Sequence, residues 1–193
     1  VFLGANDGAS GVSVLAVMGR HMGEIPSPLG VDFVLFDGEE LVYNKGDRYF
    51  YGSEFFAREY AGDQERDFKY RAAVLLDMVG DKNLELRQER NSLSWRDSRW
   101  IVKSIWKKAD RLGVREFIPK PYRTPILDDH MMLHRHGKIP ACDIIDFAYR
   151  SPDRRTNYWH TTQDTPDKCS AESLAKVGWV VHEWLKDEAK KRN

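Results

Sequence analysis

The chain has 193 residues, of which 41% are apolar and 31% charged, and its 30 basic side chains balance its 30 acidic ones. This length predicts one domain, residues 1–193, with a sizeable core. The charge balance argues against a nucleic-acid partner, because proteins that bind the phosphate backbone usually carry a basic excess. No apolar run approaches the ~20 residues that cross a bilayer, so we expect no membrane span.

The first part of the chain predicts strand, turn and helix in succession. Val1–Leu3 looks like the end of a strand, and residues 4–10 form a turn rich in glycine and alanine. The helix that should follow has apolar side chains on one face, at Val14, Leu15, Met18 and Met22. The stretch "EIPSPLG", residues 24–30, ends it.

Two apolar runs in the next part are expected to be buried strands. Residues 31–36 form the first, and "RAAVLLD", which ends on Asp77, forms the second. Between them lies a loop over residues 38–52, and Ser53 is positioned to cap a helix that runs through Tyr60.

The second half of the chain continues the alternation. We expect strands at 84–87 and 141–147, a short helix at 128–136 and a long helix over 95–112 that Gly113 ends. Ser170 should cap the last helix, whose apolar face carries Leu174, Val177, Val181, Trp184 and Leu185. Cys142 and Cys169 have no metal-binding or redox spacing, and the sequence leaves their pairing open.

Strands that are apolar on both faces and alternate with amphipathic helices indicate an α/β sheet covered on both sides. Such sheets place their chemistry just beyond the carboxyl ends of the strands. Ionisable side chains follow the apolar runs at five places in this chain. They are Asp7 in "GANDGAS", Glu39 and Glu40 in "DGEE", Asp77 in "LLDMVG", Asp128, Asp129 and His130 in "ILDDHMM", and His160 in "NYWHTTQDT".

Each of these residues also has a purely structural interpretation. Asp7 is placed to cap the helix that follows it, and Asp128 or Asp129 to cap the helix near 130. The adjacent Glu39 and Glu40 could belong to a solvated loop. Asp77 is harder to explain in this way, because an acid directly after a buried run needs a partner. Four histidines lie on predicted helices among charged residues, and we predict that they are on the surface: His21, His134, His136 and His182.

Gathered at one sheet edge, these acids would repel one another and raise their pKa values unless a cation lay among them. Two carboxylates and one neutral imidazole, with a fourth position open, make a catalytic zinc site. One of Glu39 and Glu40 can then bind the metal, while the other stays free to transfer protons.

These segments resemble the zinc-dependent glutaminyl cyclases, which share their fold with the co-catalytic zinc aminopeptidases. The resemblance runs in order from Val1 to about Asp167, through "VFLGANDGAS", "LFDGEE", "YGS", "VLLDMVG", "DDHMMLHRHGKIP" and "YWHTTQDTPD". It implies a three-layer α/β/α sandwich with a central mixed, mostly parallel sheet, and further strands upstream of Val1.

Carried over by position, the resemblance implies that Asp7, Glu40 and His160 bind zinc and that Glu39 is the general acid/base. Asp77 and Asp128 would join Glu39 in a carboxylate network, and Trp159 would line the substrate pocket. The implied reaction is cyclisation of an N-terminal glutamine to pyroglutamate at one Zn²⁺. The partners would be peptide or protein N-termini, and relatives suggest export to the periplasm or outside the cell.

The aminopeptidase branch uses the same residues differently. There two zinc ions sit together, Asp7 bridges them, Asp77 binds the second, and a His-x-Asp motif upstream of Val1 is also required. That branch usually has Ser-Asp-His where this chain has Asp128-Asp129-His130, and the extra acid favours the cyclase.

Two positions depart from the animal cyclases. The second pocket tryptophan of those enzymes corresponds to a position near Lys45, and their amide-bearing pocket residue corresponds to Leu127. The resemblance therefore does not identify the substrate. A third hypothesis is a non-catalytic binding module of the same fold. The intact Glu39 argues against it, because a metal scaffold without chemistry does not need the free acid.

Overall fold

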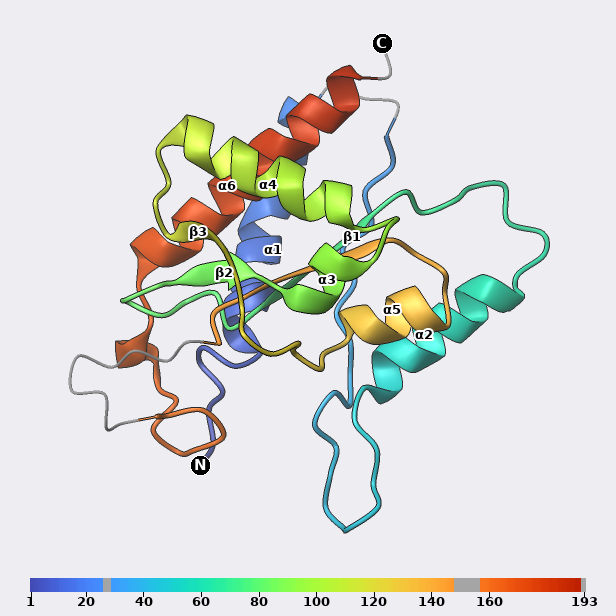
Figure 1. Cartoon of the computed structure of the whole chain (residues 1–193). Coiled ribbons are helices and arrows are strands. Elements are labelled where there is room, and N and C mark those ends of the chain that lie inside the picture. Colours follow the sequence, from blue (N-terminus) through green and yellow to red (C-terminus); the bar gives the residue numbers. More distant parts are fainter. Residues whose placement is uncertain (26–28, 148–156, 192–193) are drawn as a thin grey trace.

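The structure is a computed structural model that describes residues 1–25, 29–147 and 157–191 (Figure 1). Its elements are α1 (Ala9–His21), η1 (Met22–Glu24), α2 (Tyr51–Gly62), β1 (Ala73–Asp77), β2 (Leu86–Gln88), α3 (Arg90–Ser94), α4 (Arg99–Leu112), β3 (Phe117–Pro121), α5 (His130–Arg135), β4 (Ala141–Ile145), η2 (Pro166–Lys168) and α6 (Ala171–Lys190). Crossing a bilayer takes a long apolar helix, and none of the helices in the described residues qualifies. Cys142 and Cys169 are both free thiols.

The strands pair in parallel, as the alternation of strands and helices predicts. β1 pairs with β4 in a register that runs from Ala73 opposite Ala141 to Asp77 opposite Ile145. β2 pairs with β3, also in parallel, and β2 contacts β4. The carboxyl ends of β1 and β4 therefore meet at the same edge of the sheet.

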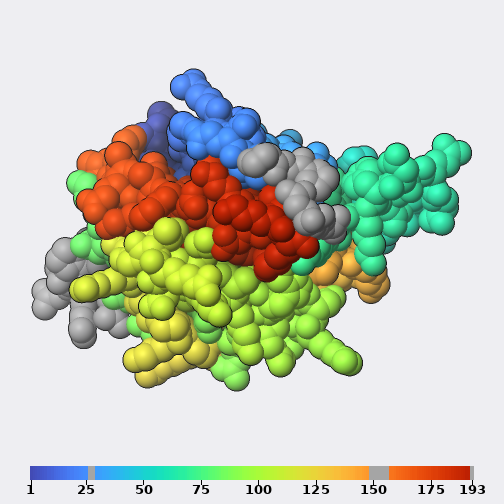
Figure 2. Space-filling view, turned by 90° about the horizontal axis from the view of Figure 1, so that it is seen from above, coloured from blue at the N-terminus to red at the C-terminus, as the bar shows by residue number. Residues whose placement is uncertain are grey.

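Helices cover both faces of the β1–β4 pair. Val74, Cys142 and Ile144 belong to the cluster formed with α1, α4 and α6, whereas Ala73 and Ala141 pack on α2 and α5. Figure 1 shows α4 and α6 together on one side and α2 and α5 together on the other. Figure 2, which looks down on the first layer, shows α6 in red alongside α4 in yellow-green. This arrangement confirms the predicted α/β fold with helices on both sides of the sheet.

The alternation along the strands also determines the face of the sheet on which two acids lie. Successive side chains of a strand point to opposite faces, so Asp77 and Asp143 share the face of Ala73 and Ala141. That face is the one covered by α5, which begins at His130. The register of β1 and β4 thus places acids from two strands beneath the start of one helix.

Local signals explain the ends of two long helices. Ser170 caps α6, because its hydroxyl accepts hydrogen bonds from the amides of Glu172 and Ser173. Gly113 ends α4 in the left-handed region, at φ 73°, as predicted.

The predicted strand over residues 31–36 is wrong. This segment is extended, but it joins no ladder among the described residues, and Phe33 and Leu35 are 37% and 62% exposed. Val1–Leu3 is likewise exposed and outside any strand. An apolar run becomes a strand only where another strand takes its backbone hydrogen bonds, and sequence periodicity does not report that partner.

Three further features differ from the sequence prediction: the start of a helix, a capping residue and a strand. The helix expected over 95–112 begins only at Arg99, and a separate short helix that was not predicted, α3, ends just before Trp95, whose backbone is extended. Ser53 lies inside α2 and does not cap it. β3 was not predicted, since its sequence "FIPKP" contains two prolines, which argue against a strand.

Candidate active site

The structure brings the ionisable residues predicted from the sequence to one region. Asp7, Glu40 and His160 each offer a ligand atom, and these atoms lie within 4.8 Å of one another. Glu39 lies close enough to Glu40, Asp129, Asp77 and Asp7 for their charges to raise its pKa. Asp128 lies near Asp77 in the same way.

The cluster of Asp7, Glu40 and His160 fits a zinc ion. His160 Nε2 lies 3.6 Å from Asp7 Oδ2, and it contacts Glu40 Oε1 directly. Asp7 Oδ2 is buried yet has no hydrogen-bond partner among the described residues, which is costly for a carboxylate unless a cation is present. Two carboxylates and an imidazole are the donor set of catalytic zinc sites.

Asp7 is held by a second acid that the sequence analysis missed. The carboxylate of Asp164 is fully buried and accepts hydrogen bonds from the amides of Asn6, at 2.8 Å, and Asp7, at 2.9 Å. Gly8, not Asp7, takes the N-cap position of α1, so the helix-capping interpretation of Asp7 is wrong. The side chain of Asp7 is therefore left for another partner. Burial and the charge of Glu40 raise the pKa of Asp7 to about 6.

The loop that carries Glu39 and Glu40 is tied to the start of α2. The carbonyl oxygens of Asp37 and Glu39 accept hydrogen bonds from the amides of Gly52, at 2.9 Å, and Phe50, at 2.9 Å. Gly52 is needed for this approach, because a Cβ there would lie 2.4 Å from Asp37 O. The "YGS" segment thus fixes the position of the two glutamates.

Glu39 and Asp77 form the acidic interior of the site. Burial, followed by the charges of Glu40, Asp129 and Asp77, raises the pKa of Glu39 to about 8. Burial and the charge of Asp7 raise the pKa of Asp77, the last residue of β1, to about 8. Such shifts favour protonated carboxyls and are typical of groups that transfer protons.

Asp128 and Asp129 lie directly before α5 and are both 5% exposed. Asp129 occupies the N-cap position, but its side chain makes no capping hydrogen bond, so the capping interpretation is wrong. Instead Asp129 Oδ1 accepts from the hydroxyl of Ser53, and its amide donates to Asp128 Oδ1 at 2.6 Å. Asp128 Oδ2 is buried without a hydrogen-bond partner in the described part of the chain.

Trp159 forms an aromatic wall beside His160. The two rings lie 4.0 Å apart, and Phe147 meets Trp159 edge-on at 5.1 Å. Trp159 also packs on an apolar cluster that contains Met78 and Ile145. Leu127, by contrast, is 68% exposed.

A second group of ionisable residues lies deeper, under α5. Glu89, His130 and Asp143 are all fully buried. Asp128, His130 and Asp143 also offer ligand atoms within 4.8 Å of one another. The sequence analysis assigned no role to Glu89 or Asp143. Asp143 could have been found, because an acid inside the predicted apolar strand 141–147 requires a partner.

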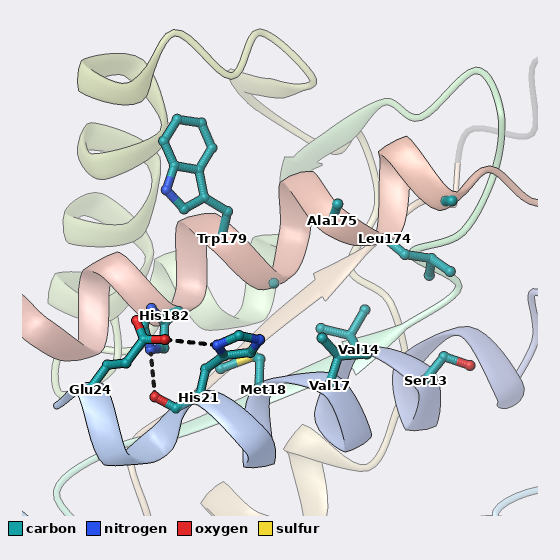
Figure 3. A pocket seen from close by; sticks show the side chains of 12 residues that line it. Ser13, Val14, Val17, Met18, His21, Glu24, Leu174, Ala175, Trp179 and His182 are labelled. Carbon is teal, nitrogen blue, oxygen red and sulfur yellow. Dashed lines mark hydrogen bonds and ion pairs between the residues drawn. The ribbon is translucent and has the colours of Figure 1, made fainter.

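An apolar groove lies elsewhere, between α1 and α6, with a volume of about 440 Å³ (Figure 3). Its lining includes Val14, Met18 and Trp179 but none of the residues predicted to bind metal or substrate. His182 lies at one end, 8% exposed, and donates to the carbonyl oxygen of His21 at 3.2 Å. The prediction that His182 is a surface residue is therefore wrong.

A protein-family model and a curated protein both match nearly the whole chain. The family model described as "Peptidase family M28" matches residues 2–185. The curated Aminopeptidase YwaD of Bacillus subtilis (strain 168) is 27% identical, over 97% of this chain and 38% of its own length. The chain thus spans well under half of that relative.

The solved structures that it resembles include both cyclases and exopeptidases. Porphyromonas gingivalis glutaminyl cyclase superposes with a TM-score of 0.84 at 30% identity, over 97% of this chain and 67% of that one. Fimbriiglobus ruber glutaminyl cyclase gives 0.84 at 37% identity, over 96% and 62% of the two chains. A Zn-dependent exopeptidase from Parabacteroides distasonis gives 0.80 at 32% identity, over 95% and 63%.

Proposed function

This chain belongs to peptidase family M28, and from that premise we propose that it is a glutaminyl-peptide cyclotransferase. The reaction converts the N-terminal glutamine of a peptide or protein to pyroglutamate and releases ammonia. The observation that carries the proposal is the partly buried Glu39, which lies beside the ligand-like Glu40 and among other acids but outside the Asp7–Glu40–His160 cluster.

Asp7, Glu40 and His160 are the residues that would hold one zinc ion. When bound, zinc acts as a Lewis acid that polarises the side-chain amide carbonyl of the glutamine. The donor set supports this assignment, as does Asp7 Oδ2, which is buried without a hydrogen-bond partner in the described residues.

Glu39 is proposed as the general acid/base. It takes a proton from the α-amine as that nitrogen attacks the amide carbon, and it delivers the proton to the departing ammonia. A carboxyl whose pKa is raised toward neutrality by burial is suited to both steps. The nucleophile is part of the same glutamine, so proximity supplies much of the rate and no attacking water is needed.

Asp77 and Asp128 are proposed to complete the proton network around Glu39. Asp128 is buried, Asp77 is partly buried, and burial raises the pKa of both, so they can share protons with Glu39. Trp159 is proposed to hold the substrate side chain against the site, because its ring lies 4.0 Å from that of His160, tilted by 37°.

The second candidate is a zinc aminopeptidase, and the 27% sequence identity with the curated Aminopeptidase YwaD favours it. Asp77 would then join Asp7 as a metal ligand and help to hold a second zinc ion; the charge of Asp7 already acts on Asp77. Glu39 would deprotonate a water molecule that attacks the first peptide bond.

The two candidates give different products from one peptide. We would incubate the zinc-loaded protein with a peptide that begins with glutamine and follow ammonia and peptide mass. A cyclase releases ammonia and leaves a blocked N-terminus, and a peptide that begins with alanine stays unchanged. Release of the first residue intact, from either peptide, would instead establish the aminopeptidase. Metal analysis separates them as well, with one zinc per chain for the cyclase and two for the aminopeptidase.

A further inference from the structure

The segment that carries His160 is anchored in the interior by Tyr158, two residues before it. Tyr158 is 6% exposed, and its hydroxyl donates a hydrogen bond to Asp81 Oδ2, in the turn that follows β1. The same hydroxyl accepts from Asn6 Nδ2 at 3.4 Å. Asn6 is fully buried and is held in turn by the amide of Gly80, which donates to its side-chain oxygen at 2.7 Å. Three side chains from separate parts of the chain thus form one buried hydrogen-bonded group.

Asn6 connects this group to the turn that carries Asp7. It is the residue before Asp7, and its backbone amide donates to Asp164 Oδ1 at 2.8 Å. The segment around His160 is therefore joined to the turn of Asp7 at two points. One is Tyr158, before the histidine, and the other is Asp164, after it.

The backbone at His160 explains why such an anchor is needed. His160 has φ 56°, in the left-handed region that residues with a side chain seldom adopt. It lies in a tight turn that Thr161 closes, with its amide at 3.2 Å and its hydroxyl at 2.7 Å from the carbonyl oxygen of Tyr158. A strained conformation of this kind persists only where the surrounding structure holds it. The hydroxyl of Tyr158 ties the turn to the interior, and the turn sets the direction of the imidazole.

The imidazole of His160 is not enclosed by packing. Its side chain is 39% exposed, so its position depends on the backbone that carries it. The ring contacts Glu40, and its Nε2 lies 3.6 Å from Asp7 Oδ2. A change in the turn therefore changes the distances between the ligand atoms. Residues that orient a metal ligand in this way commonly alter metal affinity without touching the metal.

We propose that Tyr158 is a positioning residue that holds His160 at binding distance from Asp7. It acts through the hydrogen bonds of its hydroxyl to Asn6 and Asp81. That hydroxyl already bonds two side chains, so Tyr158 is not itself a ligand. A histidine that is held in place before zinc arrives lowers the cost of binding. The inference rests on the zinc site of the proposed function, and it applies to the cyclase and the aminopeptidase alike, because both use the same three ligands.

Tyr158→Phe removes the hydroxyl and keeps the ring. We expect the zinc affinity of the protein, measured by competition with a chromophoric chelator, to fall by about 10-fold. Asp81→Asn weakens the same hydrogen bond from its other end, should have the same effect and serves where Tyr158→Phe does not fold. Tyr60→Phe is the matched control, because it removes a hydroxyl of a tyrosine that is 9% exposed in α2 and that accepts from the amide of Tyr70 at 3.0 Å. It should destabilise the protein in denaturant but leave zinc affinity unchanged.

A double-mutant cycle shows whether Tyr158 acts through His160. His160→Gln should weaken zinc binding by itself, and in that background Tyr158→Phe should lower the affinity no further. Three results would overturn the inference and leave the zinc site of the proposed function in place: an unchanged affinity in Tyr158→Phe, an equal loss in Tyr60→Phe, or a full further loss in the double variant. A zinc affinity that His160→Gln does not change would overturn both the inference and the zinc site.

Discussion

Glu39 and Glu40 are neighbours in sequence but have different surroundings. Glu40 contacts His160 and its side chain is 35% exposed, whereas Glu39 faces other carboxyls in the interior. The two side chains extend from a loop whose backbone is held by hydrogen bonds to α2, and they point in different directions. Adjacent acids can therefore have separate roles. The structure thus supports the assignment of Glu40 to the metal and Glu39 to proton transfer, which residue types alone left open.

Exchanging each glutamate for its amide tests this division. Glu39→Gln should lower kcat by about 10²–10⁴-fold, because it removes the group that accepts and returns the proton. Zinc should remain bound in that variant. Glu40→Gln should lose zinc, because an amide is a poorer ligand than a carboxylate. Metal content and turnover of both variants are measured side by side, and loss of zinc in Glu39→Gln alone would reverse the two roles.

We expect Asp164 to affect zinc binding by holding Asp7 in place, and not by direct contact with substrate. Its carboxylate holds the amides of Asn6 and Asp7. Asp164→Asn weakens these charge-assisted hydrogen bonds and lets the turn relax. We expect zinc affinity to fall by about 10–100-fold, as for other residues that orient a metal ligand. Asp167→Asn is the control, because that side chain is 69% exposed in the same segment and should leave affinity unchanged.

At the scale of elements, the site depends on the contact between α2 and the loop before it. The amides of the first turn of α2 donate to the carbonyl oxygens of residues 37–39, so the helix start and the two glutamates move together. The contact requires a backbone without a side chain at Gly52. One position in α2 therefore controls the geometry of a metal ligand that precedes it by twelve residues.

Gly52→Ala should damage both stability and metal binding. The added Cβ would lie 2.4 Å from Asp37 O and 2.7 Å from Asp37 N, both backbone atoms that cannot rotate away. We expect a loss of about 1–3 kcal/mol in the free energy of unfolding and weaker zinc binding, measured by denaturation and metal titration. Gly62→Ala, at the other end of α2, meets no atom within 4 Å and should leave zinc affinity unchanged.

For the molecule as a whole, the sequence predicted the layers better than the partners of individual segments. β1 and β4 were identifiable because their apolar side chains pack against helices on both faces. Residues 31–36 carry the same signal and are not a strand, since pairing is a tertiary property. The start of α4 was predicted at residue 95 and lies at Arg99, because the side chain of Trp95 is itself compatible with a helix.

The same distinction applies to the site. Asp7, Glu39, Glu40, Asp77, Asp128 and His160 were predicted because each follows an apolar run at a sheet edge, and they do meet. Glu89 and Asp164 were not predicted, because each acts on backbone amides that only the folded chain brings near. His130 was noted only as part of "DDH", since Glu89 and Asp143, whose carboxyls face it, lie 41 and 13 residues away.

The concentration of acids in one region predicts how the stability of the whole protein depends on pH. In the metal-free protein the pKa values are raised to about 6 for Asp7 and Asp129 and to about 8 for Glu39 and Asp77, by burial first in each case. The folded state therefore binds more protons than the unfolded state between about pH 4 and pH 8. The free energy of unfolding must then fall as the pH rises through this range. A shift of two pKa units, as at Asp129, corresponds to about 3 kcal/mol.

Denaturant unfolding at pH 5 and pH 8, with a chelator or with zinc, measures this effect. With the chelator we expect the protein to be less stable at pH 8 than at pH 5, by several kcal/mol in total. Zinc should stabilise it far more at pH 8, because the ligands bind metal only when they are deprotonated. Asp77→Asn removes one of the shifted groups and should flatten the slope in the chelator. If the metal-free protein were instead more stable at pH 8 than at pH 5, the unfolded state would have to bind more protons than the folded state. That result would mean that these acids are not buried together.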